Sequence, residues 1–331
     1  MSERHLVVLA GIYPEGTLEK FRGALPEELF TVRAVSDPEE YANMSDAEIV
    51  ILRIFKAPAE VIRNNPKLKI ILRWGAGFDS VDIEEAGRHG IFVTNTPGAN
   101  AYAVSEMTVL LMLAIGRKLL CHTDSLRDGI WSKNAFINQT MTLNHKLVGI
   151  VGGGNIGRQV AQKVQAFGAK VQYFDVFRLS PEMEKQFEMT YVSLDELLKT
   201  SDVVSLHVPL TEENHHMIGK DQIAQMKQGA MIINVARGGL VDEEALLEAI
   251  KAGRLSGAGI DCVEAEPLSA QDPLLHESNV VITPHIGGGS ADLADAIIPM
   301  LANDILSWRQ TGRPGHIVNQ KFLETAGEGQ Q

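Results

Sequence analysis

The sequence predicts an α/β protein with two doubly wound parallel sheets, one of them inserted within the sequence of the other. Two successive series of short apolar runs alternate with polar segments of helix length. A glycine-rich turn leads from a strand into a helix at the start of the second series. The length of 331 residues is sufficient for two domains, each with its own core.

The first series of apolar runs lies in residues 1–99 and predicts a small open parallel sheet. Its buried strands are expected at Leu6–Ala10, Thr31–Ala34, Ile49–Leu52, Ile70–Leu72 and Ile91–Val93. The alternation breaks at the turn Asn95-Thr-Pro97-Gly98. One long helix is then expected from about Ala101 to Leu119.

The second series supplies six strand candidates, at residues 148–151, 171–174, 203–206, 231–233, 257–260 and 280–282. A complete nucleotide-binding sheet uses about six strands. An amphipathic segment from about Ser290 to Gln310 is long enough to return to the first sheet. We therefore predict a substrate domain of residues 1–99 and 289–331, a cofactor domain of residues 100–288, and a cleft between them.

The turn that opens the second series has the pattern Gly-x-Gly-x-x-Gly, at Gly152, Gly154 and Gly157. The first glycine permits a tight turn, the second lets the backbone approach a pyrophosphate, and the third lets the helix pack closely on the strand. The free amides at the helix start, around Asn155 and Ile156, would face the phosphates with the help of the helix dipole. The order of strand, turn, helix and strand predicts a Rossmann domain inserted in a flavodoxin-like domain.

An acidic residue, Asp175, ends the next apolar run, 18 residues after Gly157. A carboxylate at this place accepts hydrogen bonds from the ribose of NAD and repels the 2′-phosphate of NADP. The expected cofactor is therefore NAD. Arg178, three residues further on, is the feature that favours NADP, because a nearby arginine can accommodate the additional phosphate.

Composition excludes several classes of partner. The net charge of −12 argues against nucleic acid and against anionic membranes, which both require a basic face. No apolar run is long enough for a signal peptide core or a membrane span, so a cytoplasmic location is expected. Cys121 and Cys262 fit no metal or redox spacing. The pair His215-His216 is expected to be exposed and has no third ligand at metal spacing, so no metal is predicted.

Reactive side chains follow three of the later strands. Arg237, Glu266 and His285 lie beyond the strands at 231–233, 257–260 and 280–282. Because ligands of open α/β sheets bind at the carboxyl ends of strands, the three side chains are expected to converge. Taken singly, they could be a helix-cap arginine, a solvated carboxylate and a loop histidine. Taken together, they suit the reduction of a 2-keto acid. This reaction needs a cation to bind the substrate oxygens and an acid to protonate the forming alkoxide. A histidine that is paired with a carboxylate can serve as the acid.

Eight segments in one order resemble the D-isomer-specific 2-hydroxyacid dehydrogenase family, over about residues 49–319. They are Arg73–Asp79, Asn95–Gly98, Ala103–Glu106, the glycine turn, His207–Thr211, Asn234–Gly239, Asp261–Pro267 and Pro284–Gly288. The resemblance implies that Arg237 binds and polarises the substrate, that His285 is the acid–base group, and that Glu266 is its partner. It also implies that Asp261 lies near the nicotinamide carboxamide. Further cofactor contacts are implied for His207, Val208, Pro209, Ala236 and Gly287.

The resemblance also implies a substrate site in the first domain. The backbone amides of Gly75, Ala76 and Gly77 would hold the substrate carboxylate, and Arg53 is similar to a family position that helps to bind substrate. A distal group would meet Arg53, Lys56, Arg73 and Trp74. Cations there would suit a phosphate. Because Trp74 would shrink the pocket, hydroxypyruvate or glyoxylate is favoured over the phosphorylated substrate of a 3-phosphoglycerate dehydrogenase.

The predicted activity is reversible hydride transfer between NAD(H) and a small 2-hydroxy or 2-keto acid. Residues 103–119 resemble the family's dimerisation element, so a homodimer is expected. A regulatory NAD-binding protein of the corepressor type is the alternative from another class, since such proteins keep much of the catalytic trio. An enzyme similar to phosphite dehydrogenase also remains possible, because it uses a similar trio. A formate dehydrogenase is a poor match, because that enzyme carries glutamine where this chain has Glu266.

Overall fold

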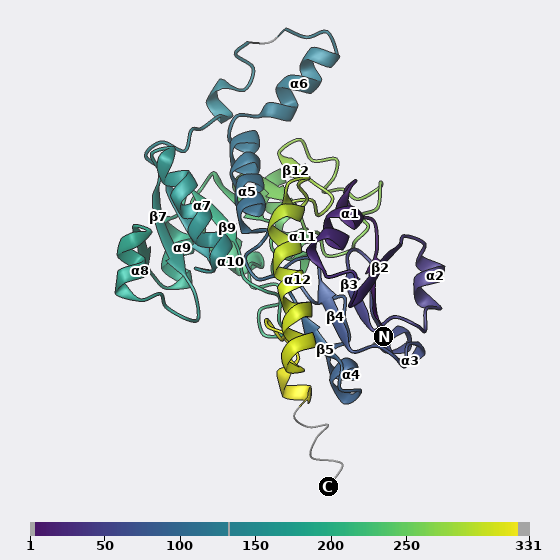
Figure 1. The fold of residues 1–331 in the computed structure, drawn as a ribbon. Coiled ribbons are helices and arrows are strands. Elements are labelled where there is room, and N and C mark those ends of the chain that lie inside the picture. The colour runs from purple at the N-terminus through teal and green to yellow at the C-terminus, as the bar shows by residue number, and fades with distance from the viewer. Residues whose placement is uncertain (1–3, 132, 324–331) are drawn as a thin grey trace. The chain divides into compact units, whose positions relative to one another are not determined.

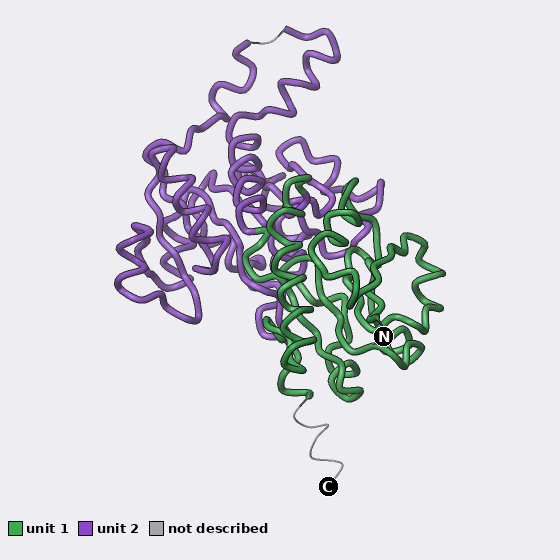
Figure 2. Tube along the Cα trace, in the orientation of Figure 1, with its two compact units in different colours: residues 1–100, 290–331 green, residues 101–289 purple. Residues whose placement is uncertain are grey.

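The computed structural model describes residues 4–131 and 133–323. The chain divides into two compact units (Figure 1, Figure 2): unit 1 is Met1–Asn100 with Ser290–Gln331, and unit 2 is Ala101–Gly289. Each unit holds one sheet, and every strand pairing within both sheets is parallel. The predicted α/β class with two doubly wound parallel sheets is thus confirmed.

Unit 1 is built on a five-stranded sheet with the order β2-β1-β3-β4-β5, which is the flavodoxin-like order. All five predicted strands are present, with ends that differ by at most one residue. Its elements are β1 (His5–Ala10), α1 (Thr17–Ala24), β2 (Phe30–Val35), α2 (Pro38–Ala42), β3 (Ile49–Leu52), α3 (Ala59–Asn64), β4 (Ile70–Arg73), α4 (Ile83–Arg88), β5 (Phe92–Thr94) and α12 (Leu293–Thr311).

The last helix, α12, belongs to the core of unit 1. Its buried residues Ile297, Leu301 and Ile305 are spaced by four and therefore lie on one helix face. They pack in one cluster with Val7 and Leu9 of the central strand β1. Each fully buried aliphatic side chain of this kind stabilises the fold by about 1.5–3 kcal/mol. Helix α12 is therefore part of the same core as the first strand of the chain.

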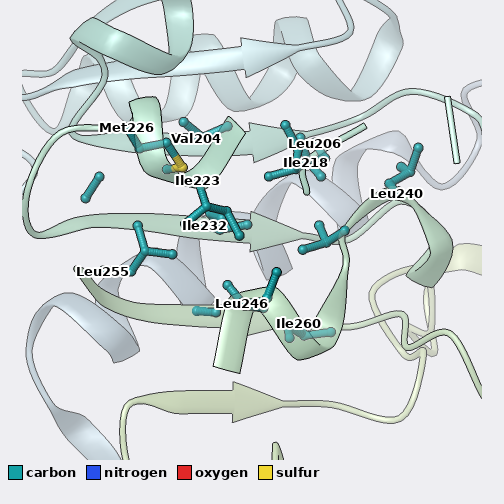
Figure 3. Packing of buried hydrophobic residues seen from close by; sticks show 14 of the residues in the cluster. Val204, Leu206, Ile218, Ile223, Met226, Ile232, Leu240, Leu246, Leu255 and Ile260 are labelled. Carbon is teal, nitrogen blue, oxygen red and sulfur yellow. The ribbon is translucent and has the colours of Figure 1, made fainter. Parts of the chain in front are cut away.

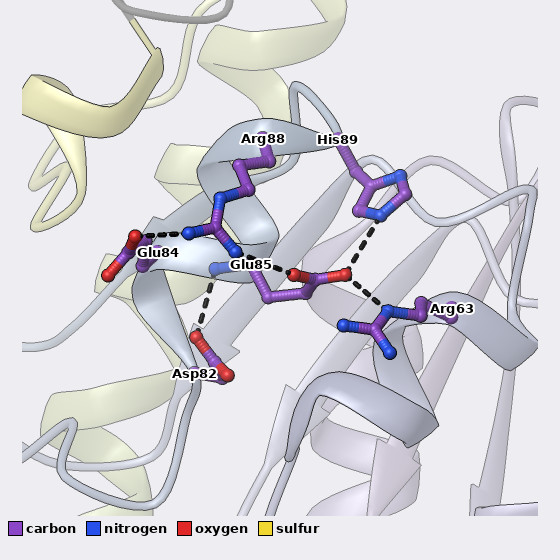
Figure 4. A network of polar contacts seen from close by, with 6 residues as sticks. All are labelled: Arg63, Asp82, Glu84, Glu85, Arg88 and His89. Carbon is purple, nitrogen blue, oxygen red and sulfur yellow. Dashed lines mark hydrogen bonds and ion pairs between the residues drawn. The ribbon is translucent and has the colours of Figure 1, made fainter.

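A polar network surrounds the buried carboxylate of Glu85 in α4 (Figure 4). The Glu85 side chain accepts hydrogen bonds from Arg63 at 2.5 Å and from Arg88 at 3.3 Å, and lies 3.1 Å from a ring nitrogen of His89. Asp82 caps the helix by accepting the N–H of Glu85 at 2.9 Å. The hydrogen bond from Arg63 is the main reason why the pKa of Glu85 is lowered from 4.5 to about 2.

This network predicts a dependence of stability on pH. The folded-state pKa lies below the ordinary value, so the stabilisation is complete above pH 4.5 and disappears as the pH falls toward about 2. We expect Glu85→Gln to lower the Tm at about pH 7, and to lose less Tm than the wild type between about pH 7 and about pH 3. Thermal unfolding at both pH values measures this effect. Glu84→Gln, at an exposed neighbouring position, is the control; equal losses for Glu85→Gln and the wild type would contradict the assignment.

Unit 2 is built on a seven-stranded sheet with the order β12-β11-β10-β9-β6-β7-β8. The six predicted strands are all present, with ends that differ by at most two residues. Its elements are α5 (Ala101–Gly116), α6 (Leu119–Arg127), η1 (Ile137–Gln139), β6 (Leu147–Val151), α7 (Asn155–Ala166), β7 (Lys170–Phe174), α8 (Pro181–Gln186), β8 (Met189–Tyr191), α9 (Leu194–Thr200), β9 (Val203–Leu206), α10 (Lys220–Gln225), β10 (Ala230–Asn234), η2 (Gly238–Leu240), α11 (Glu243–Lys251), β11 (Leu255–Ile260) and β12 (Val280–Ile282).

The predicted count of six strands was wrong, because β8 forms a seventh. This strand has only three residues and lies at the sheet edge, where β7 is its one neighbour. Its sequence Met-Thr-Tyr contains a single fully buried residue, Met189. An edge strand this short has no apolar run from which it could be recognised.

Both faces of the unit 2 sheet are buried, as parallel sheets require. On one face, Ile232 of β10 packs with Leu206 and with Leu246 of α11 (Figure 3). On the other face, Met231 and Ile233 pack with residues of α5 and α7. Alternate residues of one strand thus contribute to two cores, which hold the carboxyl ends of the strands in fixed positions.

The prediction that one long helix extends to Leu119 is wrong about where the helix ends. Helix α5 stops at Gly116, and Lys118 has a left-handed φ of 51°, which no α-helix can contain. The buried Lys118 ammonium donates to the carbonyl of Ser256 at 3.0 Å and to Asn279 at 2.6 Å, and these bonds fix the break. Helix α6 begins directly afterwards and contains no buried residue. None of the described helices is long and apolar enough to cross a membrane.

Candidate active site

The glycine turn joins β6 to α7, and the space beside its middle glycine, Gly154, is unoccupied by the described chain apart from the adjacent residues. Gly152 has a φ of 105°, which favours glycine, and a Cβ at this position would lie 2.7 Å from the carbonyl oxygen of His207. A Cβ on Gly157 would lie 2.0 Å from the carbonyl oxygen of Gly152, so helix and turn are in close contact. At Gly154, by contrast, no atom of the described chain beyond the adjacent residues lies within 4 Å of the Cβ position. The open backbone is followed directly by α7, whose first N–H groups have no side-chain cap.

Asp175, at the end of β7, is hydrogen-bonded to the glycine turn. Its carboxylate accepts the N–H of Gly153 at 2.7 Å and the N–H of Phe177 at 3.0 Å. These two bonds fix the negative charge beside the turn. Arg178, the residue that favoured NADP, forms a two-pronged pair with Glu184, with N–O distances of 2.8 and 3.0 Å. Its guanidinium is therefore already engaged by a carboxylate.

His207 lies just beyond β9 and is partly exposed, but its Nδ1 atom is buried. Desolvation lowers the pKa of His207 to about 3, so the imidazole is neutral. Nε2 of the ring lies 2.8 Å from the hydroxyl of Ser205, while Nδ1 has no hydrogen-bond partner in the described part of the chain. A neutral ring offers no charge to a cofactor. Any cofactor contact of this segment would therefore be made by uncharged groups, such as its backbone, Val208 and the exposed Pro209.

Glu266 and His285 lie side by side in the loops that follow β11 and β12. Nδ1 of His285 is 3.1 Å from each of the two carboxylate oxygens of Glu266. Both side chains are a little under half exposed, at 46% and 43%. Because the carboxylate takes Nδ1, the other ring nitrogen, Nε2, is the one available for proton exchange with a ligand.

Asp261 organises the turn that carries His285. Its buried carboxylate accepts the hydroxyl of Thr283 at 2.5 Å, the N–H of Ile286 at 2.9 Å and the N–H of Gly287 at 2.7 Å. The carbonyl of Asp261 accepts the N–H of His285 at 2.8 Å. His285 itself has a left-handed φ of 52°. Both Asp261 and Gly287 were expected to contact the cofactor, but their polar groups are engaged with each other and hold the histidine turn.

Arg237 lies in the turn between β10 and η2. Asn234 holds this turn through its amide, which donates to the carbonyl of Arg237 at 2.8 Å and accepts the N–H of Ala236 at 3.1 Å. The Arg237 guanidinium donates to the carbonyl of Ala236 at 2.7 Å. A Cβ on Gly238 would lie 2.0 Å from the backbone of Val263, so the turn is in close contact with the loop that follows β11. The arginine turn and the Glu266 loop are therefore neighbours.

Cys262 lies close to the candidate catalytic residues Glu266 and His285. The sequence interpretation had assigned it no role. Its sulfur belongs to a cluster with Glu266 and His285 in which the polar atoms lie within 4.8 Å of one another. Burial raises the pKa of the Cys262 thiol, the charge of Asp261 raises it further, and the charge of Arg237 opposes the rise. Glu266 and His285 thus lie beside one buried, protonated thiol, and the turn that carries Arg237 packs against the same loop through Gly238. A lone cysteine at a strand end gives no sequence signal for this position.

In unit 1, the loop after β4 presents two backbone amides. The carbonyl of Ala76 accepts the amide of Asn95 at 2.6 Å, and the carbonyl of Gly77 accepts Nε of Arg73 at 3.0 Å. The N–H of Gly75 is already bonded to the hydroxyl of Thr96 at 3.0 Å. The N–H groups of Ala76 and Gly77 have no acceptor among the described residues. Of the three amides expected to bind a carboxylate, these two are the available ones.

Two residues of unit 1 do not have the surroundings expected for pocket residues. Arg73 is engaged inside the protein, since it also donates to the carbonyl of Leu52 at 3.0 Å. Trp74, which was expected to narrow a pocket, is 8% exposed and packs edge-on against Tyr13 with 5.1 Å between ring centroids, so most of its surface belongs to the core. The Trp74 side chain directly follows the buried strand β4 and is part of the hydrophobic core of unit 1. Arg53, in contrast, is partly exposed and donates to the carbonyl of Ile12.

Comparisons with known proteins, by sequence and by structure, all identify 2-hydroxyacid dehydrogenases and related reductases as similar to this chain. The sequence model of the D-isomer specific 2-hydroxyacid dehydrogenase, NAD binding domain, matches residues 109–287. A hydroxypyruvate reductase of Thermotoga maritima is 44% identical over 246 residues, 74% of this chain and 78% of that protein. A D-3-phosphoglycerate dehydrogenase of Archaeoglobus fulgidus is 40% identical over 83% of this chain and 52% of its own length. The crystal structure of a glyoxylate reductase from Paecilomyes thermophila has a TM-score of 0.82 and 28% identity, and the match covers 97% of this chain and 100% of that one.

Proposed function

The chain belongs to the D-isomer specific 2-hydroxyacid dehydrogenase family, and we propose that it reduces hydroxypyruvate or glyoxylate with NADH. Family membership makes it an NAD-binding oxidoreductase that acts on the CH–OH group of 2-hydroxy acids. Beyond that, the keto acid and the role of each site residue are what we propose. The main support is the pair of Glu266 and His285, with the turn that carries Arg237 packed against the loop that carries Glu266.

The glycine turn has the features that a bound dinucleotide needs. The open backbone at Gly154 would accept the pyrophosphate, and the uncapped start of α7 would direct its N–H groups and dipole toward it. The fixed carboxylate of Asp175 would accept the ribose hydroxyls. NADH bound there supplies the hydride that reduces the keto carbon.

The protein groups then carry out the proton chemistry. Arg237 binds the substrate and polarises its keto oxygen, and His285 donates a proton from Nε2 to that oxygen as the carbon is reduced. Glu266 stabilises the protonated imidazole through Nδ1 and keeps the ring oriented. In the oxidation of a 2-hydroxy acid each proton movement reverses. Asp261 acts as a positioning residue for this histidine.

The surroundings of the unit 1 loop favour a short, unphosphorylated substrate. The amides of Ala76 and Gly77 suit a carboxylate, and Asn95 and Arg73 hold the carbonyls on the same two residues. Because Arg73 is engaged with backbone carbonyls, it is a poor candidate for a phosphate ligand. A phosphate is best bound by several cations. The sequence offered Arg53, Lys56 and Arg73 for this purpose, and the backbone bonds of Arg73 leave it less suited to the role.

Steady-state oxidation of NADH tests the proposed activity. Hydroxypyruvate, glyoxylate, pyruvate and phosphohydroxypyruvate would be compared by kcat/KM. We expect hydroxypyruvate or glyoxylate to be preferred over the 3-phosphate. A preference for the phosphate of tenfold or more, about 1.4 kcal/mol in transition-state binding, would contradict the substrate assignment. Absence of turnover with every acid would contradict the proposed activity and favour the regulatory alternative.

The cofactor preference depends on Asp175. We expect the wild type to bind NADH more tightly than NADPH, because the Asp175 carboxylate repels a 2′-phosphate. Asp175→Ala should narrow or reverse this preference, as measured by the ratio of the two Kd values. Arg178→Ala is the matched control and should leave the ratio unchanged, because Arg178 is paired with Glu184. Equal use of NADH and NADPH by the wild type would show that Asp175 does not have this role.

The proposal includes the expected homodimer through residues 101–119, and we extend its interface to the adjoining helix α6. This helix extends away from the rest of unit 2 (Figure 1) and has no buried residue. Leu119, Leu126 and Trp131 are exposed at 51%, 53% and 83%. Apolar side chains gathered on a projecting segment are typical of an interface between protein chains. Sedimentation equilibrium of the purified protein measures the association, and a strict monomer would contradict it.

A further inference from the structure

A cluster of two histidines and a glutamate lies on the surface of unit 2, apart from the catalytic trio. His215 and His216 belong to the segment between β9 and α10, and Glu264 belongs to the loop that follows β11. Nε2 of His215 lies 3.3 Å from one carboxylate oxygen of Glu264, and Nε2 of His216 lies 3.2 Å from the other. The expectation that the histidine pair lacks a third ligand was therefore wrong. The third ligand comes from 48 residues further along the chain and is brought there by the fold.

The spacing of these atoms matches that of metal ligands. A tetrahedral zinc ion with bonds of about 2.0–2.1 Å places neighbouring ligand atoms about 3.3–3.4 Å apart. The two nitrogen–oxygen distances, 3.2 and 3.3 Å, are close to this value, and all three ligand atoms lie within 4.8 Å of one another. Two imidazoles and one carboxylate form a donor set that favours zinc and other late divalent metals over Mg²⁺ and Ca²⁺.

The backbone around the cluster is held in place before any metal binds. The N–H of His216 donates to the carbonyl of Gly239 at 2.7 Å, and His216 has a left-handed φ of 52°. The N–H of Glu264 donates to the carboxylate of Glu243 at 2.8 Å. These bonds fix the backbone from which the His216 and Glu264 side chains project. Glu243 and Glu264 also add negative charge, which attracts a dication.

We propose that His215, His216 and Glu264 bind one divalent transition-metal ion, for which Zn²⁺ is the best match, with the remaining positions open to water. The bound ion would join the segment after β9 to the loop that carries Glu266, two residues beyond Glu264. Metal binding would thus restrain the loop that bears the partner of His285.

A second cluster, Cys262 with Glu266 and His285, has comparable spacing and must be distinguished experimentally. Titration of the full-length protein with ZnCl₂ in a calorimeter, in a non-chelating buffer, measures affinity and stoichiometry. His215→Ala and Glu264→Gln each remove one ligand of the surface cluster. His285→Ala removes a ligand of the other cluster. His145→Asn is the matched control, because His145 is an exposed histidine with a φ of 60°, a conformation that asparagine tolerates.

We expect one zinc ion per chain for the wild type, for His145→Asn and for His285→Ala. His215→Ala and Glu264→Gln should weaken binding by about tenfold or more, since a lost ligand costs at least as much as a lost outer-shell bond. Titration with NADH on the same samples verifies that each variant is folded. Unchanged zinc affinity in both ligand variants, or loss of binding in His285→Ala alone, would overturn the proposal. So would the absence of zinc binding by the wild type.

Discussion

Replacement of His285 by alanine is expected to lower kcat by about 10²–10⁴-fold and to leave NADH affinity nearly unchanged. The substitution removes the group that we propose as the proton donor to the keto oxygen. It leaves the glycine turn and Asp175 intact, because neither of them contacts the histidine turn through a hydrogen bond in the described part of the chain. Single-turnover oxidation of bound NADH measures the chemical step, and a fluorescence titration measures NADH affinity.

A milder variant tests the same pair in another way. Glu266→Gln keeps the shape of the partner but removes its charge, so the protonated imidazole is less favoured. We expect a smaller loss of kcat and a shift of the pH–rate profile for reduction to lower pH. An unchanged profile would indicate that the pair of Glu266 and His285 does not act in the reaction. Retention of more than about a third of kcat in His285→Ala, with chemistry limiting, would refute the acid–base assignment itself.

The second large effect is expected at the glycine turn. Gly154→Ala should weaken NADH binding by about tenfold or more, because the added methyl group would occupy the space that we propose for the pyrophosphate. The Tm of the cofactor-free protein should not change. Gly154 has an ordinary φ of −67°, and the described chain leaves the Cβ position open. Calorimetric titration with NADH and thermal unfolding provide the two measurements.

Two other glycines serve as comparisons. Gly23→Ala lies in α1 of unit 1, where the Cβ position is also open, and should change neither NADH binding nor stability by much. Gly157→Ala would place a methyl group 2.0 Å from a carbonyl oxygen, so it should destabilise the protein even without cofactor. Unchanged NADH affinity in Gly154→Ala would show that the cofactor does not approach the backbone there.

The strands could be predicted from the sequence because most of them are buried on both faces. Ile49–Leu52 and Val203–Leu206 are buried throughout and have the predicted bounds; the first is an uninterrupted apolar run, and the second is apolar except at Ser205. The edge strand β8 could not be found, because three residues with one exposed side chain leave no pattern. The end of α5 was missed for another reason. The bonds that break the helix at Lys118 come from Ser256 and Asn279, far along the chain.

The reactive residues could be located in the sequence, but their surroundings could not. Position after an apolar strand predicted that Glu266 and His285 meet, and the observed 3.1 Å distances agree with that prediction without testing its chemical role. The engagement of Arg73 with two backbone carbonyls and the burial of Trp74 depend on the packing of β4 and its neighbours. Likewise, only the fold brings Glu264 to His215 and His216.

The buried carboxylate of Asp261 reduces the share of substrate binding energy that is needed to order the catalytic loop. Three hydrogen bonds to this group hold the turn around His285 before any ligand binds. When an acid–base residue lies on a mobile loop, part of the binding energy of each substrate is used to order that loop. Here the ordering is completed when the chain folds. Glyoxylate and hydroxypyruvate have few atoms and can form few contacts, so an enzyme that acts on them gains most from a catalytic group that is pre-organised in this way.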